Sequence, residues 1–198
     1  MIEHQRMRLL RIVSLLIAVV PAAGCTRSPA AIGPPPGSIA PRTPTLKSFD
    51  LTDQDGKPFS SRSLKGDPWV GCFFFTQCPS VCWRMNQSLA KWQADHSQSA
   101  FKFVSITCDP QTDTPAALKL YADHFKADPR RWIFLTGDMP YISKVGRDFF
   151  RLAVERGTHS SRVVVFDRKG EIRGSFDIAD ANQFKKCEAL LAEIEAEA

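Results

Sequence analysis

The sequence has few of the features that mark a nucleic-acid-binding protein. Its 198 residues carry a formal net charge of +5, which falls to +3 once residues 1–25, with three arginines and one glutamate, are set aside. The remaining basic residues are scattered, and they form no cluster with interleaved aromatic side chains. Because nucleic-acid binding relies on concentrated positive charge, the sequence argues against a nucleic-acid partner.

The chain also lacks an internal repeat and a long apolar run. Its most apolar stretch, Ile12 to Ala23, is shorter than the roughly 20 residues that a helix needs to cross a bilayer. Hydrophobic residues make up 43% of the chain and charged residues 24%, the balance of an ordinary globular protein. This length and composition suffice for one domain with a proper core.

The first 25 residues are predicted to be a targeting segment. Three arginines precede the apolar run Ile12 to Val20, and small residues then lead to Cys25. The pattern resembles a bacterial lipoprotein signal, in which Cys25 becomes the lipidated N-terminus, although Ala22 stands where such signals usually have leucine. The alternative is an uncleaved membrane anchor. In either case we expect an extracytoplasmic protein, on the periplasmic side, attached to the membrane through its N-terminus.

Residues 26–45 are predicted to be a linker, because six of the 14 prolines fall between Pro29 and Pro44. Proline removes backbone donors and favours an extended, solvated spacer. The folded domain is therefore expected over residues 46–198.

Within this domain, strands and helices are expected to alternate. A hairpin of Phe49 to Phe59 comes first, and Trp69 to Phe75 forms a strand buried on both faces. The later expected elements are a helix to about Asp95, the strand Phe101 to Thr107, a helix from Pro115 to about Phe125, the strand Trp132 to Leu135, a helix from Met139 to about Arg151, a hairpin of Arg162 to Asp167 with Glu171 to Phe176, and a last helix capped by Asp180. The order predicts an α/β domain with a central mixed sheet flanked by helices.

Two cysteines stand where the first buried strand gives way to a helix. Cys78 is expected in the turn and Cys82 in the first helical turn, because Val81, Met85 and Leu89 recur at helical spacing. Unpaired N–H groups at a helix start favour thiolate and are expected to lower the cysteine pKa. Two such thiolates can close a disulfide or hold a soft metal ion such as Cu(I) or Zn(II).

The other cysteines are expected to be structural. Cys72 lies inside a buried strand and Cys187 on the apolar face of the last helix, while Cys108 ends a strand and could lie near the pair. Five cysteines remain after Cys25, an odd number, so a full disulfide framework is not supported. A redox-type pair after the first core strand and a closing β-β-α unit resemble the thioredoxin fold.

His159 is the candidate nitrogen ligand. It lies in a loop just before the strand that begins at Arg162, and in a thioredoxin-like fold such a loop lies against the cysteine turn. An imidazole with two thiolates makes a three-coordinate set that suits copper. His96 and His124 end helices, where a solvated imidazole is expected.

Asp109 and Asp113 allow two interpretations. Both lie in a turn before the helix that starts at Pro115, where aspartate commonly forms turns and caps helices. Alternatively, either carboxylate supports the metal ligands or contacts a partner protein.

Several motifs in this order resemble the Sco/SenC copper-chaperone family. They are Thr76-Gln77-Cys78-Pro79-Ser80-Val81-Cys82, Ser105-Ile106-Thr107-Cys108-Asp109-Pro110, Asp113-Thr114-Pro115, Trp132-Ile133-Phe134-Leu135-Thr136-Gly137 and His159-Ser160. The resemblance implies a membrane-tethered, thioredoxin-like domain that binds Cu(I) or Cu(II). It also implies a role in assembling the copper centre of cytochrome c oxidase, with a copper-accepting oxidase subunit or another copper or thiol protein as partner.

In that family the two motif cysteines correspond to Cys78 and Cys82, and the ligand histidine corresponds to His159. Two positions depart from the family pattern, because Trp83 replaces a usual proline and Ser80 a frequent aspartate. These changes leave the ligands in place and put the partner-docking surface in question.

Two enzymatic alternatives remain open. In a thiol–disulfide oxidoreductase, Cys78 and Cys82 would be the redox pair, but thioredoxin-like reductases place a proline before the strand that faces their cysteines. No proline follows Pro140 here. A thiol peroxidase would need an activated cysteine near a threonine and an arginine, and Thr76 with Arg84 could supply these.

Overall fold

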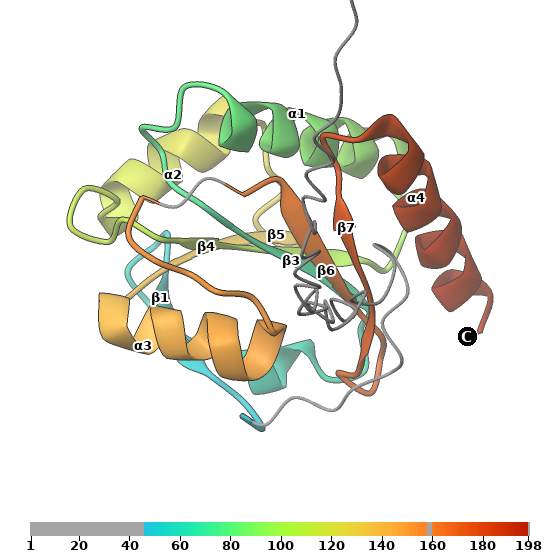
Figure 1. Ribbon diagram of the computed structural model, residues 1–198, viewed down its shortest axis with the longest axis horizontal. Coiled ribbons are helices and arrows are strands. Elements are labelled where there is room, and N and C mark those ends of the chain that lie inside the picture. The colour runs from blue at the N-terminus through green and yellow to red at the C-terminus, as the bar shows by residue number, and fades with distance from the viewer. Residues whose placement is uncertain (1–45, 158–159, 198) are drawn as a thin grey trace, which may run out of the picture. The chain divides into compact units, whose positions relative to one another are not determined.

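The computed structural model describes residues 46–157 and 160–197, which form a seven-stranded mixed sheet with helices on both faces (Figure 1). The strands lie in the order β2-β1-β5-β4-β3-β6-β7. The elements are β1 (Asp50–Asp53), β2 (Pro58–Ser60), a 3₁₀ helix (Ser61–Leu64), β3 (Trp69–Phe74), α1 (Val81–Asp95), β4 (Lys102–Thr107), α2 (Pro115–His124), β5 (Trp132–Thr136), α3 (Met139–Val145), a π-helical turn (Gly146–Phe150), β6 (Arg162–Phe166), β7 (Ile172–Asp177) and α4 (Ala181–Ala196).

The centre of the sheet is parallel and its margins are antiparallel. β3 pairs with β4, and β4 with β5, in parallel, whereas β6 runs antiparallel to β3. Every residue of β3 is buried, as its continuous apolar sequence predicts for a central strand covered on both faces. The mixed α/β sheet, the N-terminal hairpin and the closing β6-β7-α4 unit confirm the expected architecture.

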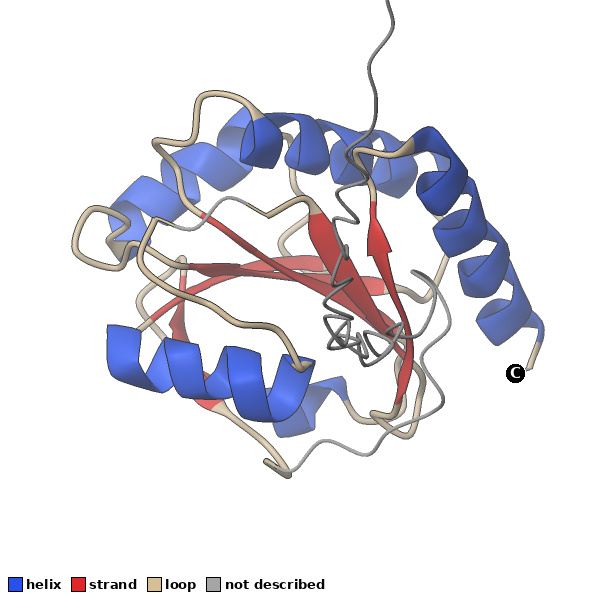
Figure 2. Cartoon of the chain, in the orientation of Figure 1, coloured by secondary structure: helices blue, strands red, loops and turns tan. Residues whose placement is uncertain are grey.

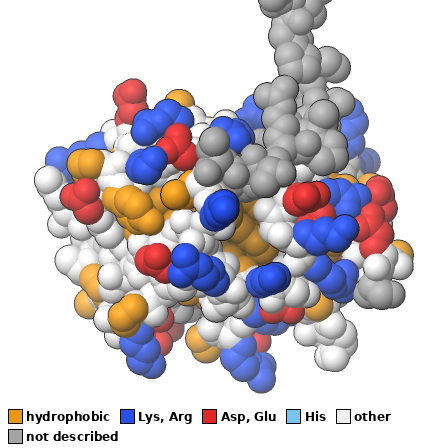
Figure 3. All heavy atoms as spheres, turned by 90° about the horizontal axis from the view of Figure 1, so that it is seen from below, with side chains coloured by type: hydrophobic (Ala, Val, Ile, Leu, Met, Phe, Trp, Pro, Cys, Tyr) orange, Lys and Arg blue, Asp and Glu red, His pale blue; other side chains and the backbone are white. Residues whose placement is uncertain are grey.

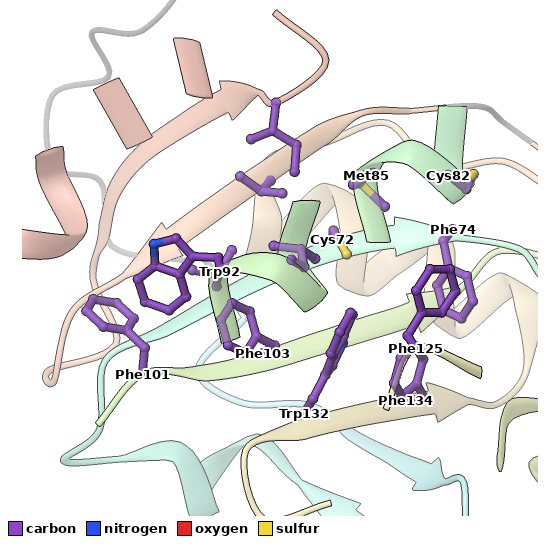
Figure 4. Packing of buried hydrophobic residues seen from close by; sticks show 14 of the residues in the cluster. Cys72, Phe74, Cys82, Met85, Trp92, Phe101, Phe103, Phe125, Trp132 and Phe134 are labelled. Atoms are coloured by element: carbon purple, nitrogen blue, oxygen red, sulfur yellow. The ribbon is translucent and has the colours of Figure 1, made fainter. Parts of the chain in front are cut away.

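Two hydrophobic cores lie on opposite faces of the sheet, as the layers in Figure 2 show. The first core packs α1, α2 and α4 against the sheet, and it includes Trp92, Trp132 and the sulfurs of Cys72 and Cys82 (Figure 4). The second core lies under α3 and the π-helical turn and is rich in phenylalanine. The two cores hold β3 from both sides and position the turn at its end.

Side-chain caps set the start of two helices as the sequence predicts. The Thr114 hydroxyl accepts from the backbone N–H of Ala117, with Pro115 in the first turn of α2. The Asp180 carboxylate accepts from the backbone N–H groups of Asn182 and Gln183 at the start of α4.

The helix expected from Met139 to about Arg151 runs to Phe150, but its type changes along its length. α3 ends at Val145, a π-helical turn follows, and Arg151 takes a left-handed conformation with φ of 60°. The wide turn buries both Phe149 and Phe150 in the second core. π-helical turns are uncommon and appear mostly as single turns joined to α-helices, as this one is.

Several predicted features lie outside the described residues. They are the targeting segment with Cys25, the linker of residues 26–45 and His159. Among the helices of residues 46–157 and 160–197, none is long and apolar enough to span a membrane.

Candidate functional site

The candidate site is the cysteine turn, residues 75–82, which connects β3 to α1. The backbone N–H of Cys78 donates to the Phe75 carbonyl at 3.2 Å. The backbone N–H of Cys82, in the first turn of α1, donates to the Cys78 sulfur at 3.2 Å. Ser80, the N-cap residue, makes no side-chain capping bond, so the Cys78 sulfur occupies the place of a capping oxygen. The predicted placement of both cysteines is therefore confirmed.

Both sulfurs belong to the first core. Cys78 is 4% exposed and Cys82 is 0% exposed, and Figure 4 shows Cys82 near Phe74, at one end of the cluster. The expectation that the helix start lowers the cysteine pKa is wrong for Cys82. Burial, reinforced by the neighbouring sulfurs of Cys78 and Cys108, raises the pKa of the Cys82 thiol, and the Phe75 backbone opposes this only in part.

Two polar side chains of the first core lie beside the cysteine pair, and the sequence argument missed both. The Asn86 amide nitrogen donates to the Tyr121 hydroxyl at 3.0 Å. Burial raises the pKa of Tyr121, the hydrogen bond from Asn86 opposes this in part, and the sulfurs of Cys82, Cys72 and Cys78 reinforce it. Asn86 stands four residues after Cys82 and is fully buried, so a polar residue on the apolar face of α1 was the available signal.

Asp113 fastens the cysteine turn to the neighbouring strand β4. Its buried carboxylate accepts from the Thr76 backbone N–H at 3.0 Å and from the hydroxyls of Thr76 and Thr107. It does not cap α2, since Thr114 does so. The Thr76 hydroxyl is thus directed to Asp113, and Arg84 is solvent-exposed, which disfavours the peroxidase alternative.

Asp109 lies nearer the surface. It pairs with the Arg156 guanidinium, Nε to Oδ1 at 2.8 Å, and a hydrogen bond from Thr112 together with Arg156 lowers the pKa of the carboxyl. Next to this pair, the Gly157 N–H donates to the Cys108 carbonyl at 3.2 Å. These bonds bring the described end of the loop before β6 to the end of β4, beside the cysteine turn.

The remaining cysteines are core residues. Cys72 contacts the Ser105 hydroxyl at 3.4 Å, and Cys187 lies among apolar side chains of α4 and the sheet. Burial raises the pKa of each of these two thiols to about 12. Cys108 is fully buried in the second core, and its backbone N–H donates to the Phe74 carbonyl.

His96 and His124 are exposed as expected, but neither ring is surrounded by water alone. His96 stacks on Trp92 at 4.6 Å between ring centroids, and His124 packs against Trp83 at 4.7 Å. Trp83, which departs from the family pattern, also packs on Phe125 and is partly buried. Its indole therefore forms part of the α1–α2 contact next to the cysteine turn.

The arrangement suits either a soft metal ion or a disulfide. The two cysteines are four residues apart, the backbone N–H of one donates to the sulfur of the other, and all five cysteines from Cys72 to Cys187 are present as thiols. Within residues 46–157 and 160–197, no three His, Cys, Asp or Glu side chains are grouped as a metal site. His159, the predicted third ligand, lies outside these residues.

Comparison with known proteins identifies relatives over most of the chain. The family model described as SCO1/SenC matches residues 38–195. A protein from Stutzerimonas stutzeri, whose name describes it as copper-binding, is 30% identical over 148 residues, covering 69% of this chain and 71% of the relative.

Solved structures of Sco family proteins also superimpose on most of this chain. A SCO1/SenC family lipoprotein from Bacillus anthracis superimposes with a TM-score of 0.69 and 30% identity, covering 78% of this chain and 96% of that one. ScoI of Bradyrhizobium japonicum, solved with copper bound, has a TM-score of 0.59 and 27% identity, with 77% and 99% covered. BsSco, described through a disulfide switch and as a member of the Sco family of cytochrome c oxidase assembly proteins, has a TM-score of 0.62 and 26% identity, with 70% and 86% covered.

Proposed function

Because this chain belongs to the SCO1/SenC family, we propose that it is a copper metallochaperone that delivers copper, or thiol reducing equivalents, to the copper centre of cytochrome c oxidase. One observation carries the proposal: the Cys78 sulfur accepts the Cys82 backbone N–H, so the turn holds two buried sulfurs together at the start of a helix. Similar proteins are described as copper-binding or were solved with copper bound. Copper is the cargo here and is bound and passed on.

In the proposed mechanism, Cys78, Cys82 and His159 hold the copper ion. Each thiol loses one proton when it binds the metal, so copper binding at neutral pH offsets the raised pKa of Cys82. The core around the sulfurs limits access of water and competing ligands. Asp113 keeps the turn in place through Thr76, and so acts on the ligands without touching them. A partner with thiolate or imidazole ligands then takes the ion by ligand exchange.

Membrane attachment through a lipid on Cys25 is part of the proposal. The pattern of residues 1–25 supports it, as does the similar lipoprotein from Bacillus anthracis. Attachment on the periplasmic side places the cysteine pair where disulfides form and persist. Mass spectrometry of the membrane-extracted protein tests this part, and a mature chain that keeps residues 1–24 or has an unmodified Cys25 would contradict it.

The main test compares copper loading of reduced and oxidised protein with loading of a histidine variant. Reduced protein should bind copper, whereas a Cys78–Cys82 disulfide offers no thiolate and should not. His159→Ala should lose Cu(II) more than Cu(I), because Cu(II) prefers nitrogen ligands while Cu(I) tolerates two sulfurs. His96→Ala is the matched control, since that imidazole stacks on Trp92 at the end of α1 opposite to Cys82.

In these samples, thiol titration should give the same number of reactive thiols per protein for both histidine variants and for the wild type. Unchanged copper retention in His159→Ala would remove the third ligand from the proposal. Equal copper binding by the oxidised form would remove the cysteine pair as well.

A thiol–disulfide oxidoreductase is the second candidate, favoured by the closeness of the two sulfurs and by the disulfide switch described for BsSco. In that reaction Cys78 and Cys82 each lose a proton and together pass two electrons to a partner disulfide, which becomes two thiols. Weak copper binding together with altered thiol reactivity in His159→Ala would support this candidate over copper delivery.

A further inference from the structure

The second notable surface of the molecule lies at the opposite end of β3 from the cysteine turn. A pocket of about 540 Å³ opens there, and we call it the basic pocket. It is lined by Leu46, Lys47, Ser61, Arg62, Leu64, Lys65, Trp69, Phe149, Lys169, Gly170 and Glu171. β3 begins at Trp69 beside this pocket and ends at Phe74 beside the cysteine turn. At roughly 3.3 Å per residue, these two strand ends lie about 17 Å apart.

The pocket combines an apolar floor with a basic rim. Leu64, Trp69 and Phe149 belong to the second core and form the floor. The side chains of Lys47, Arg62, Lys65 and Lys169 are exposed around it, and none makes an ion pair within the described part of the chain.

Glu171 is the single acidic residue among those that line the pocket in the described chain, so the lining carries a net positive charge of three. Figure 3 views the molecule from the side of α3 and shows basic, acidic and apolar side chains interspersed on that face. Elsewhere on the surface many basic residues are neutralised, as Lys119 is by Asp55 and Lys91 by Asp95. The basic pocket therefore retains charge that an anionic partner could neutralise.

The chain outside the described residues joins the domain at this pocket. Leu46, the first described residue, lines it, and its backbone N–H donates to the Asp148 carbonyl at 3.3 Å. The linker precedes Leu46 directly, and Cys25, which we propose to be lipidated, precedes the linker. A membrane tether thus enters the domain at its basic, unpaired face, and it keeps the local concentration of bilayer high there.

From the charge of the rim, the apolar floor and the entry point of the tether, we propose that the basic pocket docks on an anionic phospholipid bilayer. Lysine and arginine near such a surface are attracted to the negative headgroups, and the attraction weakens with salt. The linker itself is a poorer occupant, because residues 26–45 carry only the basic charges of Arg27 and Arg42 and no acidic residue. This inference rests on the membrane attachment proposed above.

Docking in this orientation has a consequence for the proposed function. The face at the Trp69 end of β3 would lie against the lipid, and the cysteine turn at the Phe74 end would point away from it. A membrane-anchored copper carrier would then present its sulfurs to partner domains that project from the bilayer. The domain would not need to rotate about its linker to reach them.

The test uses the full chain in nanodiscs of neutral phosphatidylcholine or of phosphatidylcholine mixed with anionic phosphatidylglycerol. Lysines are acetylated briefly, and labelling is read by mass spectrometry. In anionic discs, labelling of Lys47, Lys65 and Lys169 should fall by about threefold or more and should recover in high salt, which screens exposed charges. Lys91 on α1 and Lys119 on α2 lie over the other face of the sheet and serve as internal controls whose labelling should not change.

A charge-reversal variant sharpens the result. Lys65→Glu with Lys169→Glu should abolish protection of Lys47 by anionic discs. The matched control, Lys91→Glu with Lys119→Glu, should keep that protection. All four positions are exposed, so neither variant removes core contacts.

Three results would overturn the inference. They are equal labelling in anionic and neutral discs, protection already complete in neutral discs, and protection that survives charge reversal. Copper loading is measured in the same discs. Retained copper without lysine protection refutes the docking alone, and lysine protection without copper binding refutes the metallochaperone proposal alone. Failure of the chain to stay on any disc refutes the tether and the docking together.

Discussion

Cys82 at the start of α1 and Cys187 in the middle of α4 pack into the same hydrophobic core, yet only one lies in a candidate site. Their exposed fractions are 0% and 4%, and burial raises the pKa of both thiols. Cys187 has hydrocarbon around it. Cys82 has a second sulfur one helical turn before it and its own backbone N–H directed at that sulfur.

Burial therefore does not separate a structural cysteine from a candidate ligand. What differs is the backbone next to the sulfur. A helix start leaves N–H groups without helical partners, whereas the middle of α4 has none to offer. The strand-to-helix turn also brings two cysteines together at the C-terminal end of β3. Solvent and partners can reach this turn, since Gln77 and Pro79 within it are exposed.

The largest effect is expected when each of these two cysteines is changed to serine. Cys82→Ser should lower copper affinity on the order of 100-fold or more, because it removes a thiolate, and outer-shell changes alone cost 10–100-fold. Cys187→Ser should leave copper affinity within about threefold but should lower thermal stability, because it buries a hydroxyl in hydrocarbon. Competition against a Cu(I) chelator and thermal unfolding measure the two effects. Equal loss of copper in both variants would show that fold integrity, and not ligation, controls binding.

A smaller effect is expected at Asp113, whose carboxylate holds the cysteine turn through Thr76. Asp113→Ala leaves the Thr76 backbone N–H without its buried acceptor and should lower the free energy of unfolding by about 3 kcal/mol. Thr114→Ala, the neighbouring control, removes only the α2 cap and should cost about 1 kcal/mol. Urea denaturation compares the two variants. Should Asp113→Ala prove no worse than the control, the carboxylate would not be what holds the turn.

The smallest effect concerns the Cys187 thiol and the pH dependence of the free energy of unfolding. The pKa of Cys187 rises from an ordinary value of 9.0 to about 12 in the folded protein. The unfolded chain therefore loses this proton first, so the thiol's contribution to stability is complete below pH 9 and declines as the pH rises towards 12. Between pH 9 and 10 the wild type should lose about 1 kcal/mol more than Cys187→Val. Denaturation curves at pH 8, 9 and 10 check this, and parallel losses in both proteins would contradict it.

Local pattern was enough to predict much of the fold and part of the site. The order of strands and helices, the caps at Thr114 and Asp180, and the positions of Cys78 and Cys82 each depend on neighbours within a few residues. The family motifs pointed to copper through the same residues. His159 remains a prediction, since it lies outside the described part of the chain.

Sequence reasoning was wrong or silent where distant residues decide. It placed the end of the helix near Arg151 correctly but could not foresee that the last turn, with Phe149 and Phe150 buried in the second core, is π-helical. It could not decide whether Asp113 caps a helix or supports the metal ligands. The deciding contact is with Thr76, which is 37 residues away along the chain. It expected a lowered pKa for Cys82 because the helix start is a local feature, whereas desolvation comes from the whole core.

By itself, then, the sequence determined which cysteines are the candidates for the chemistry and on which local elements they stand, because helical periodicity, caps and the spacing of two cysteines are short-range properties. Only the tertiary structure decided what surrounds them: the Asp113 contacts that hold the turn, the Tyr121 and Asn86 pair beside the sulfurs, and the basic pocket assembled from four separate stretches of chain. Burial and electrostatic environment are sums over atoms that are distant in sequence, and they take their values only once the two cores have closed on β3.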